Sequence, residues 1–222
     1  MTKNTTAHAP GPAALRTVLA AALGTALLAG CGISRPYPLV RTFTLDRPEA
    51  LEARAEPKAS RASLIVTASP PPGAYEGRKL VYLRQNRELV ADFYSELSAP
   101  PARAVADGIA KLLEFSEPTI LVSRAQGAGG PDWSLDISLL DMYGDLTTEP
   151  MTARLAITAT LSDLRRMNPR PAFARDYVKG VPAPQGADET RAEALVRAYS
   201  EAVREIVEEL RPELRGILLG RR

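Results

Sequence analysis

Histidine and cysteine are almost absent from this sequence of 222 residues. The one histidine is His8 and the one cysteine is Cys31, so both lie within the first 31 residues. The rest of the chain lacks the side chains that a Ser-His-Asp triad, a Cys-His pair or the usual zinc sites require. A single cysteine also excludes a disulfide within the chain. We therefore expect no enzymatic activity, no metal site and no cofactor.

Charged residues are common but balanced beyond the amino terminus. The chain has 28 Lys and Arg and 26 Asp and Glu, which gives a formal net charge of +2. Lys3 and Arg16 are the only charged residues before Cys31, so the remainder is neutral. No basic stripe with interleaved aromatic residues follows, so nucleic-acid binding is not expected. Hydrophobic residues make up 45% of the chain, enough for one globular domain with a core.

An uncharged, mostly apolar run over residues 17–28 follows Lys3 and Arg16. Its length is typical of the hydrophobic region of a secretory signal peptide and is too short for a membrane-spanning helix. The run ends in Leu28-Ala29-Gly30-Cys31, which resembles the lipobox of bacterial lipoproteins, where the cysteine thiol takes a diacylglyceryl group. We predict a signal peptide over residues 1–30, lipidation of Cys31, a lipidated tether over residues 31–38 and a folded domain over residues 39–216.

Lipidation predicts where the protein resides. Each buried methylene contributes about 0.8 kcal/mol, so two or three acyl chains would give stable anchoring. The residue after Cys31 is Gly32. In enterobacteria an Asp at this position resembles an inner-membrane retention signal. Its absence favours the outer membrane and a periplasm-facing domain. The alternative is a buried apolar helix that ends by chance in a cysteine.

The spacing of apolar residues predicts strands, a helix, more strands and a final helix. Alternation or compact apolar runs indicate strands, and a 3.6-residue period indicates helices. Thr190 and Glu193 form a capping-box pattern before the last helix, and Pro212 is expected to end or kink it. Strands are expected around residues 40–44, 62–69, 79–83, 88–94, 119–123, 135–139, 151–161 and 171–179, and helices from residues 101–115 and from residue 190 onwards.

This order predicts an α/β or α+β fold, a single compact domain in which a mixed β-sheet is covered by two main helices. The β-hairpin at residues 78–94 should turn at Gln85-Asn86-Arg87.

Three segments carry a family resemblance. They are Arg41-Thr42-Phe43-Thr44-Leu45, Tyr75-Glu76-Gly77-Arg78-Lys79-Leu80-Val81-Tyr82, and Phe93-Tyr94-Ser95-Glu96-Leu97-Ser98-Ala99-Pro100-Pro101 leading into a helix. Together with the lipobox they resemble the ABC-type transport auxiliary lipoprotein family, and its paraquat-inducible protein C type in particular. One departure is Leu97, where family members often carry Trp.

The resemblance implies both a fold and a function. The fold would be similar to the amino-terminal domain of TolB. The partner would be the substrate-binding subunit, of the mammalian-cell-entry type, of an inner-membrane ABC transporter. Such systems move lipids or hydrophobic solvents between the inner and outer membranes. A homo-oligomer that surrounds a conduit is a further possibility.

Arg78, Tyr82 and Arg84 on the expected hairpin are the candidate partner-binding residues. The alternative is an exposed strand whose long side chains cover apolar surface while their polar ends remain in water. An exposed hairpin edge can also receive a strand from a partner, because its N–H and C=O groups are unpaired.

Other polar groups favour simpler explanations. Asp136, Asp141 and Asp145 suggest a carboxylate pair, but solvated strand and loop carboxylates are commoner. Arg165 and Arg166 resemble a small site for anionic headgroups, and a water-exposed turn explains them equally well.

The leading hypothesis is thus a lipid-anchored adaptor that docks a lipid-transport complex. The alternative is a lipoprotein that itself binds lipid or assists envelope assembly. An enzyme that depends on a carboxylate such as Asp136 ranks third.

Overall fold

The computed structural model describes residues 39–45, 62–123 and 130–220. The chain divides into two units, Met1–Leu39 and Val40–Arg222, and the architecture below is that of the second unit. The signal peptide, Cys31 and the tether lie outside the described residues, so these expectations stay predictions. Within the described part, no helix is long and apolar enough to span a membrane.

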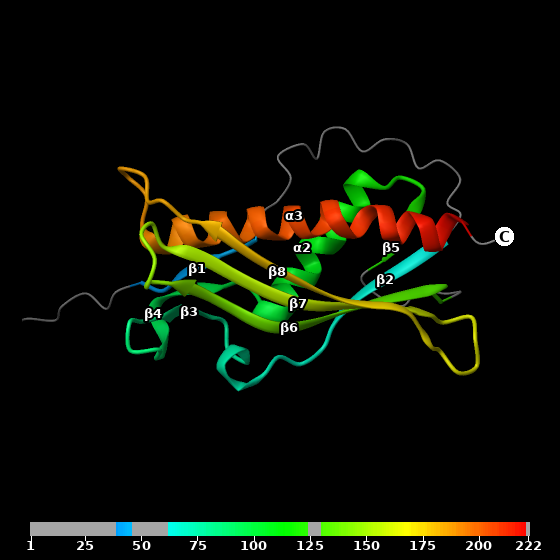
Figure 1. Ribbon diagram of the computed structural model, residues 1–222, viewed down its shortest axis with the longest axis horizontal. Helices are drawn as coiled ribbons and strands as arrows, with labels where there is room; N and C mark the ends of the chain where they lie inside the picture. Colours follow the sequence, from blue (N-terminus) through cyan, green and yellow to red (C-terminus); the bar gives the residue numbers. More distant parts are fainter. Residues whose placement is uncertain (1–38, 46–61, 124–129, 221–222) are drawn as a thin grey trace, which may run out of the picture. The chain divides into compact units, whose positions relative to one another are not determined.

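In the described residues, eight strands form one mixed sheet, and two α-helices pack on it (Figure 1). In chain order the elements are β1 (Arg41–Phe43), β2 (Ala62–Ala68), the 3-10 helix η3 (Gly73–Tyr75), β3 (Lys79–Leu83), β4 (Leu89–Leu97), α2 (Pro101–Ser116), β5 (Ile120–Ser123), β6 (Trp133–Asp145), β7 (Thr152–Asp163), β8 (Pro171–Pro182) and α3 (Arg191–Gly220).

Strand β6 organises the sheet. On one side it pairs antiparallel with β7 along its whole length, and β7 then carries β8. On the other side β2 pairs parallel with the start of β6, while β3 pairs parallel with its end at Gly144 and Asp145. Beyond β2 lies β5, and beyond β3 lie β4 and then β1. The two halves of the sheet therefore meet along β6.

Alternating side chains explain why β6 and β7 have one buried face. Leu135, Ile137 and Leu139 on β6 are at most 2% exposed, whereas the residues between them are polar and partly exposed. A shift of register between Leu139 and Asp141 places Met142 in the core again. A period of two residues buries one face of a strand, as the sequence predicts.

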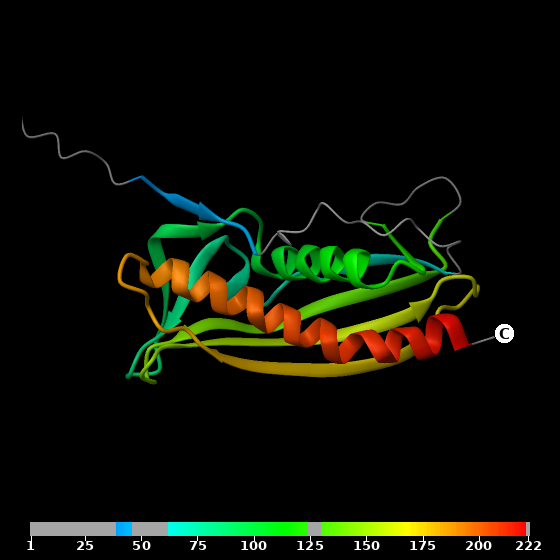
Figure 2. The same cartoon turned by 90° about the horizontal axis from the view of Figure 1, so that it is seen from above.

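Both helices cover the same face of the sheet (Figure 2). Helix α2 packs on β2, β5 and β6, whereas α3 packs on β7 and β8, and the helices also contact each other. Gly108 permits this contact, since a Cβ atom there would lie 3.3 Å from Cγ1 of Val203. The predicted mixed sheet covered by two helices is confirmed.

The capping box at the start of α3 is also confirmed. Glu193 Oε2 accepts hydrogen bonds from the backbone N–H and the hydroxyl of Thr190, both at 2.6 Å. Arg41 adds an ion pair with Glu193 and donates to Thr190 Oγ1 at 3.2 Å, so β1 is tied to the start of the last helix. The hydrogen bonds from Thr190, followed by the Arg41 guanidinium, lower the pKa of Glu193 to about 2.

Of the two expectations for Pro212, that it ends or kinks α3, the first is wrong. The helix continues past Pro212 to Gly220, so proline does not end it. Proline lacks an N–H group for the carbonyl of Glu208. Packing of Leu210, Leu214 and Leu218 into the core continues on both sides of Pro212 and accounts for the uninterrupted helix.

Glu193 makes stability depend on pH in a defined window. Its folded pKa of about 2 is below the ordinary value of 4.5, so its contribution is full above pH 4.5 and is lost as the pH falls towards 2. Glu193→Gln should lower the free energy of unfolding at pH 7 and flatten its fall over this window. Urea denaturation between pH 2 and pH 7 measures both effects.

Glu208→Gln is the matched control, because Glu208 is an exposed carboxylate further along the same helix. An acid-induced loss of stability that is equally steep in the native protein and in Glu193→Gln would contradict the assigned role of Glu193.

Candidate functional site

Strand β4 departs from regular pairing halfway along its length. Lys79 of β3 pairs with Glu96, but Val81, two residues later, pairs with Ala91. One residue of β3 thus faces the four residues 92–95 of β4, which form a bulge larger than the usual two residues against one. Bulges change the direction in which side chains project from a strand.

Asp92 holds this bulge in shape. Its Oδ1 atom accepts hydrogen bonds from the backbone N–H groups of Tyr94 at 2.8 Å and Ser95 at 3.0 Å. Its Oδ2 atom accepts from the hydroxyl of Tyr82 at 3.3 Å. The Tyr82 side chain is buried, and burial, followed by the nearby Asp92 charge, raises its pKa. A core side chain thus fixes the carboxylate that shapes the bulge.

The bulge exposes two consecutive aromatic side chains. Phe93 is 74% exposed and Tyr94 is 52% exposed, and their ring centroids are 6.3 Å apart. Lys79 Nζ lies 5.0 Å from the centroid of Phe93. Val40 and Leu89 are also exposed at the two ends of this strand edge. We call Val40, Leu89, Phe93 and Tyr94 the β4 edge surface. Adjacent exposed apolar side chains such as Phe93 and Tyr94 are typical of protein or membrane interaction sites.

The outer edge of β4 is only partly paired. Among the described residues, β1 pairs parallel with Ser95, Glu96 and Leu97 alone, and no strand pairs with residues 89–94 on that side. Backbone N–H and C=O groups at such an edge can receive a strand from another chain. The β4 edge surface therefore combines exposed aromatic rings with an open strand edge.

The three candidate partner-binding residues lie on or next to this hairpin, but in different environments. Arg78 is half-exposed and its Nη2 is 2.7 Å from Glu96 Oε1. Arg84 is exposed, and its Nη1 is 3.8 Å from Glu88 Oε2. Tyr82 is 8% exposed and so offers little surface to a partner, although it supports the bulge through Asp92. Partner binding by these residues stays a prediction.

The sequence named Phe93 and Tyr94 only within a segment that carries the family resemblance, and it did not point to Asp92, Phe93 or Tyr94 as binding residues. One signal was present: two adjacent large aromatic residues cannot both face the core of a regular strand, because consecutive side chains point to opposite faces. Asp92 directly precedes these two residues, and because Asp favours local turns it strengthens that signal.

The three carboxylates that the sequence suggested, Asp136, Asp141 and Asp145, accept hydrogen bonds from hydroxyl groups. Asp136 accepts hydrogen bonds from Thr67 at 3.0 Å and from Ser69 at 2.6 Å, linking β2 to β6. Asp141 accepts from the Tyr75 hydroxyl at 3.2 Å, and Asp145 accepts from Thr147. Over residues 39–45, 62–123 and 130–220, no group of three or more His, Cys, Asp and Glu side chains is placed to hold a metal ion.

Comparisons with known proteins bear on the fold. No family model matches the chain, and no curated protein matches it. The structure is similar to the crystal structure of protein XCC0632 from Xanthomonas campestris, described by the family model DUF330, with 19% sequence identity and a TM-score of 0.56. This match covers 78% of the present chain and 89% of the other.

A second similar crystal structure is that of an uncharacterized protein, with 13% identity and a TM-score of 0.54. That match covers 78% of this chain and 99% of the other. At these identities the comparisons show a shared fold: the domain has the architecture seen in the DUF330 protein.

Removing the Asp92 carboxylate should loosen the bulge. Asp92→Ala leaves the amides of Tyr94 and Ser95 and the Tyr82 hydroxyl without their acceptor, so we expect a loss of about 1–3 kcal/mol in the free energy of unfolding. Hydrogen exchange at these two amides should also become faster.

The matched control is Asp107→Ala, which removes a carboxylate paired with Arg103 on the exposed side of α2. It should change stability by less than about 0.5 kcal/mol. Unchanged exchange at Tyr94 and Ser95 in Asp92→Ala would show that Asp92 does not hold the bulge.

Proposed function

We propose that this protein is a lipid-anchored periplasmic adaptor, an auxiliary component of an ABC-type transport system for lipids or hydrophobic solvents. In this proposal Cys31 carries the anchor in the outer membrane, and the β4 edge surface docks the transporter's substrate-binding subunit of the mammalian-cell-entry type. The protein makes and breaks no bond. Its role is to attach the transport complex and align it with the membrane.

The β4 edge surface is the observation that carries the proposal. The bulge in β4 holds the side chains of Phe93 and Tyr94 outwards. Regular pairing between β3 and β4 is interrupted where this bulge forms. Burying either ring against a partner would contribute roughly 1.5–3 kcal/mol. Residues 89–91, which precede the bulge, also offer backbone groups to an added strand, which would set the register of the partner.

The position of this surface suits an anchored adaptor. β1 lies beside β4, and only the residues between Cys31 and Arg41 connect β1 to the proposed anchor. A fully extended chain of that length spans at most about 35 Å. The ion pair between Arg41 and Glu193 joins β1 to α3. The partner would therefore be held close to the anchoring membrane.

The resemblance to the ABC-type transport auxiliary lipoprotein family supports the choice of partner, and the lipobox supports the choice of anchor. The alternative is a lipoprotein that itself binds lipid. A cavity of about 270 Å³ next to Leu146, Met151 and Arg191 is below the roughly 300–1,000 Å³ of ordinary small-molecule sites. A second hollow, of about 360 Å³, is lined by Glu208, Arg211, Pro212 and Arg215, a mostly charged set that does not suit a lipid acyl chain. Together the two cavities favour docking over enclosure of a lipid.

Anchoring and docking can be tested separately in the natural host. We expect the native protein to fractionate with the outer membrane, to begin at an acylated Cys31 in an intact-mass measurement, and to co-purify in mild detergent with the substrate-binding subunit. Phe93→Ser with Tyr94→Ser should remain in the membrane and lose at least about 90% of the co-purified partner, since more than about 1.4 kcal/mol of contact energy is removed.

Two control variants complete the design. Val178→Ser changes an exposed apolar residue on β8, at the opposite edge of the sheet, and should retain the partner. Cys31→Ala should be unprocessed and unacylated. Retention of the partner by the double variant would refute docking through β4, whereas a stoichiometric lipid in the purified protein without any partner would favour the lipid-binding alternative.

A further inference from the structure

The connection between β7 and β8 has an unusual composition. Residues 164–170 read Leu-Arg-Arg-Met-Asn-Pro-Arg, with three arginines and no acidic residue. Met167 is completely exposed, and Leu164 is 36% exposed. We call residues 164–170 the hairpin crown. The residues after Cys31 are neutral as a whole, so this loop is a local concentration of positive charge with an apolar side chain at its centre.

The base of the crown is firmly held. Arg165 donates two side-chain hydrogen bonds to the Asp163 carboxylate, each at 2.9 Å, and its guanidinium carbon lies 5.0 Å from the ring centroid of the buried Trp133. The backbone N–H of Leu164 donates to the Asp132 carbonyl at 2.8 Å. These contacts engage the Arg165 side chain in stabilising the fold. The remainder of the loop projects outwards.

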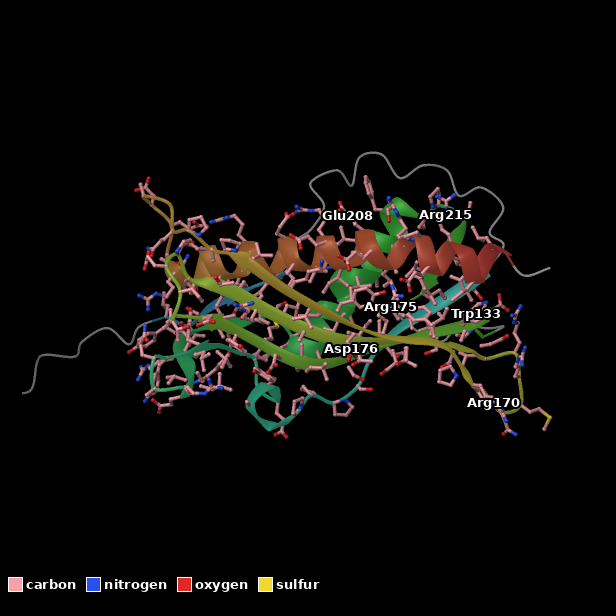
Figure 3. All side chains as sticks on the ribbon, in the orientation of Figure 1. Trp133, Arg170, Arg175, Asp176, Glu208 and Arg215 are labelled. Carbon is pink, nitrogen blue, oxygen red and sulfur yellow. The ribbon has the colours of Figure 1, made fainter. Side chains whose placement is uncertain are left out.

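Two of the arginines keep charge available for a ligand. Arg166 is 63% exposed, and its Nε is 3.5 Å from the Asp163 carboxylate. Both oxygens of that carboxylate already accept hydrogen bonds from Arg165. Arg170 has no ion pair within the described part of the chain, and Figure 3 shows it beyond the body of the sheet, at the end of the β7–β8 hairpin. Met167 lies between these two positions in the sequence.

We propose that the hairpin crown binds the surface of an anionic phospholipid bilayer, with Met167 entering the headgroup region and Arg166 and Arg170 contacting lipid phosphates. A soluble phosphate would engage the arginines and leave Met167 in water. A bilayer would contact both the arginines and Met167, because its interface accepts apolar side chains next to cations. One apolar side chain with two cations gives weak, reversible binding, which suits a second contact in a protein that has another anchor.

The crown and the β4 edge surface lie far apart. The crown follows Asp163, which pairs with Trp133 at the start of β6, whereas β3 and β4 join the sheet at Gly144 and Asp145 at the end of β6. The length of β6 separates the two regions by roughly 40 Å. Lipid binding by the crown therefore does not depend on the proposed docking of a partner.

A fluorescent probe at the crown tests this inference in the full chain. Cys31→Ser combined with Met167→Cys gives a protein with one thiol, which takes the environment-sensitive dye NBD. We expect NBD emission to rise about twofold or more with vesicles of equal phosphatidylcholine and phosphatidylglycerol, and to change little with phosphatidylcholine alone. Adding Arg166→Gln and Arg170→Gln should remove most of this response.

The control places the probe by Gln85→Cys in the same Cys31→Ser chain, because the exposed turn between β3 and β4 lies at the other end of the sheet. It should not respond. No rise at position 167 with anionic vesicles, or an equal rise with both lipid compositions, would overturn the proposal. Competition by inorganic phosphate at constant ionic strength would instead assign the site to a soluble anion. A response to polyglutamate without one to anionic vesicles would assign it to an acidic protein segment.

Discussion

The pairing of β6 with β7 is the interaction on which the rest of this domain depends. It runs from Trp133 opposite Asp163 to Asp145 opposite Thr152, with one irregularity near Leu139. β2 and β3 share the other edge of β6, so the parallel and antiparallel parts of the sheet are joined through this one strand. The buried face of the pair also provides the floor on which both helices pack.

This arrangement separates what the domain presents at its two ends. The hairpin crown extends from one end of β6 and β7, and the β3–β4 hairpin with its bulge is attached at the other end (Figure 1). In both features, contacts between polar or charged groups hold apolar side chains in a position exposed to water. Asp92 does so for Phe93 and Tyr94, and the contact of Asp163 with Arg165 does so for Met167. Neither arrangement improves the core, which is why we interpret both as binding surfaces.

Much of the fold was predictable from periodicity and local signals. Alternation in β6 and β7, the polar turn of the β3–β4 hairpin and the pairing of Thr190 with Glu193 each depend on residues close in sequence. The bulge was not predictable, because it depends on the register between two strands and on a hydrogen bond from the buried Tyr82. The contact of Arg41 with Glu193 joins segments about 150 residues apart, which periodicity cannot reveal. Lipidation at Cys31 rests on the sequence alone.

The central claim is that Phe93 faces a partner in the assembled envelope. The most direct measurement is to place a photo-crosslinking amino acid at position 93 in the natural host, with position 178 on β8 as the control. The account predicts a crosslinked product that contains the substrate-binding subunit, formed at position 93 and absent at position 178. Equal crosslinking at both positions, or none at position 93 with the protein present in the membrane, would contradict it.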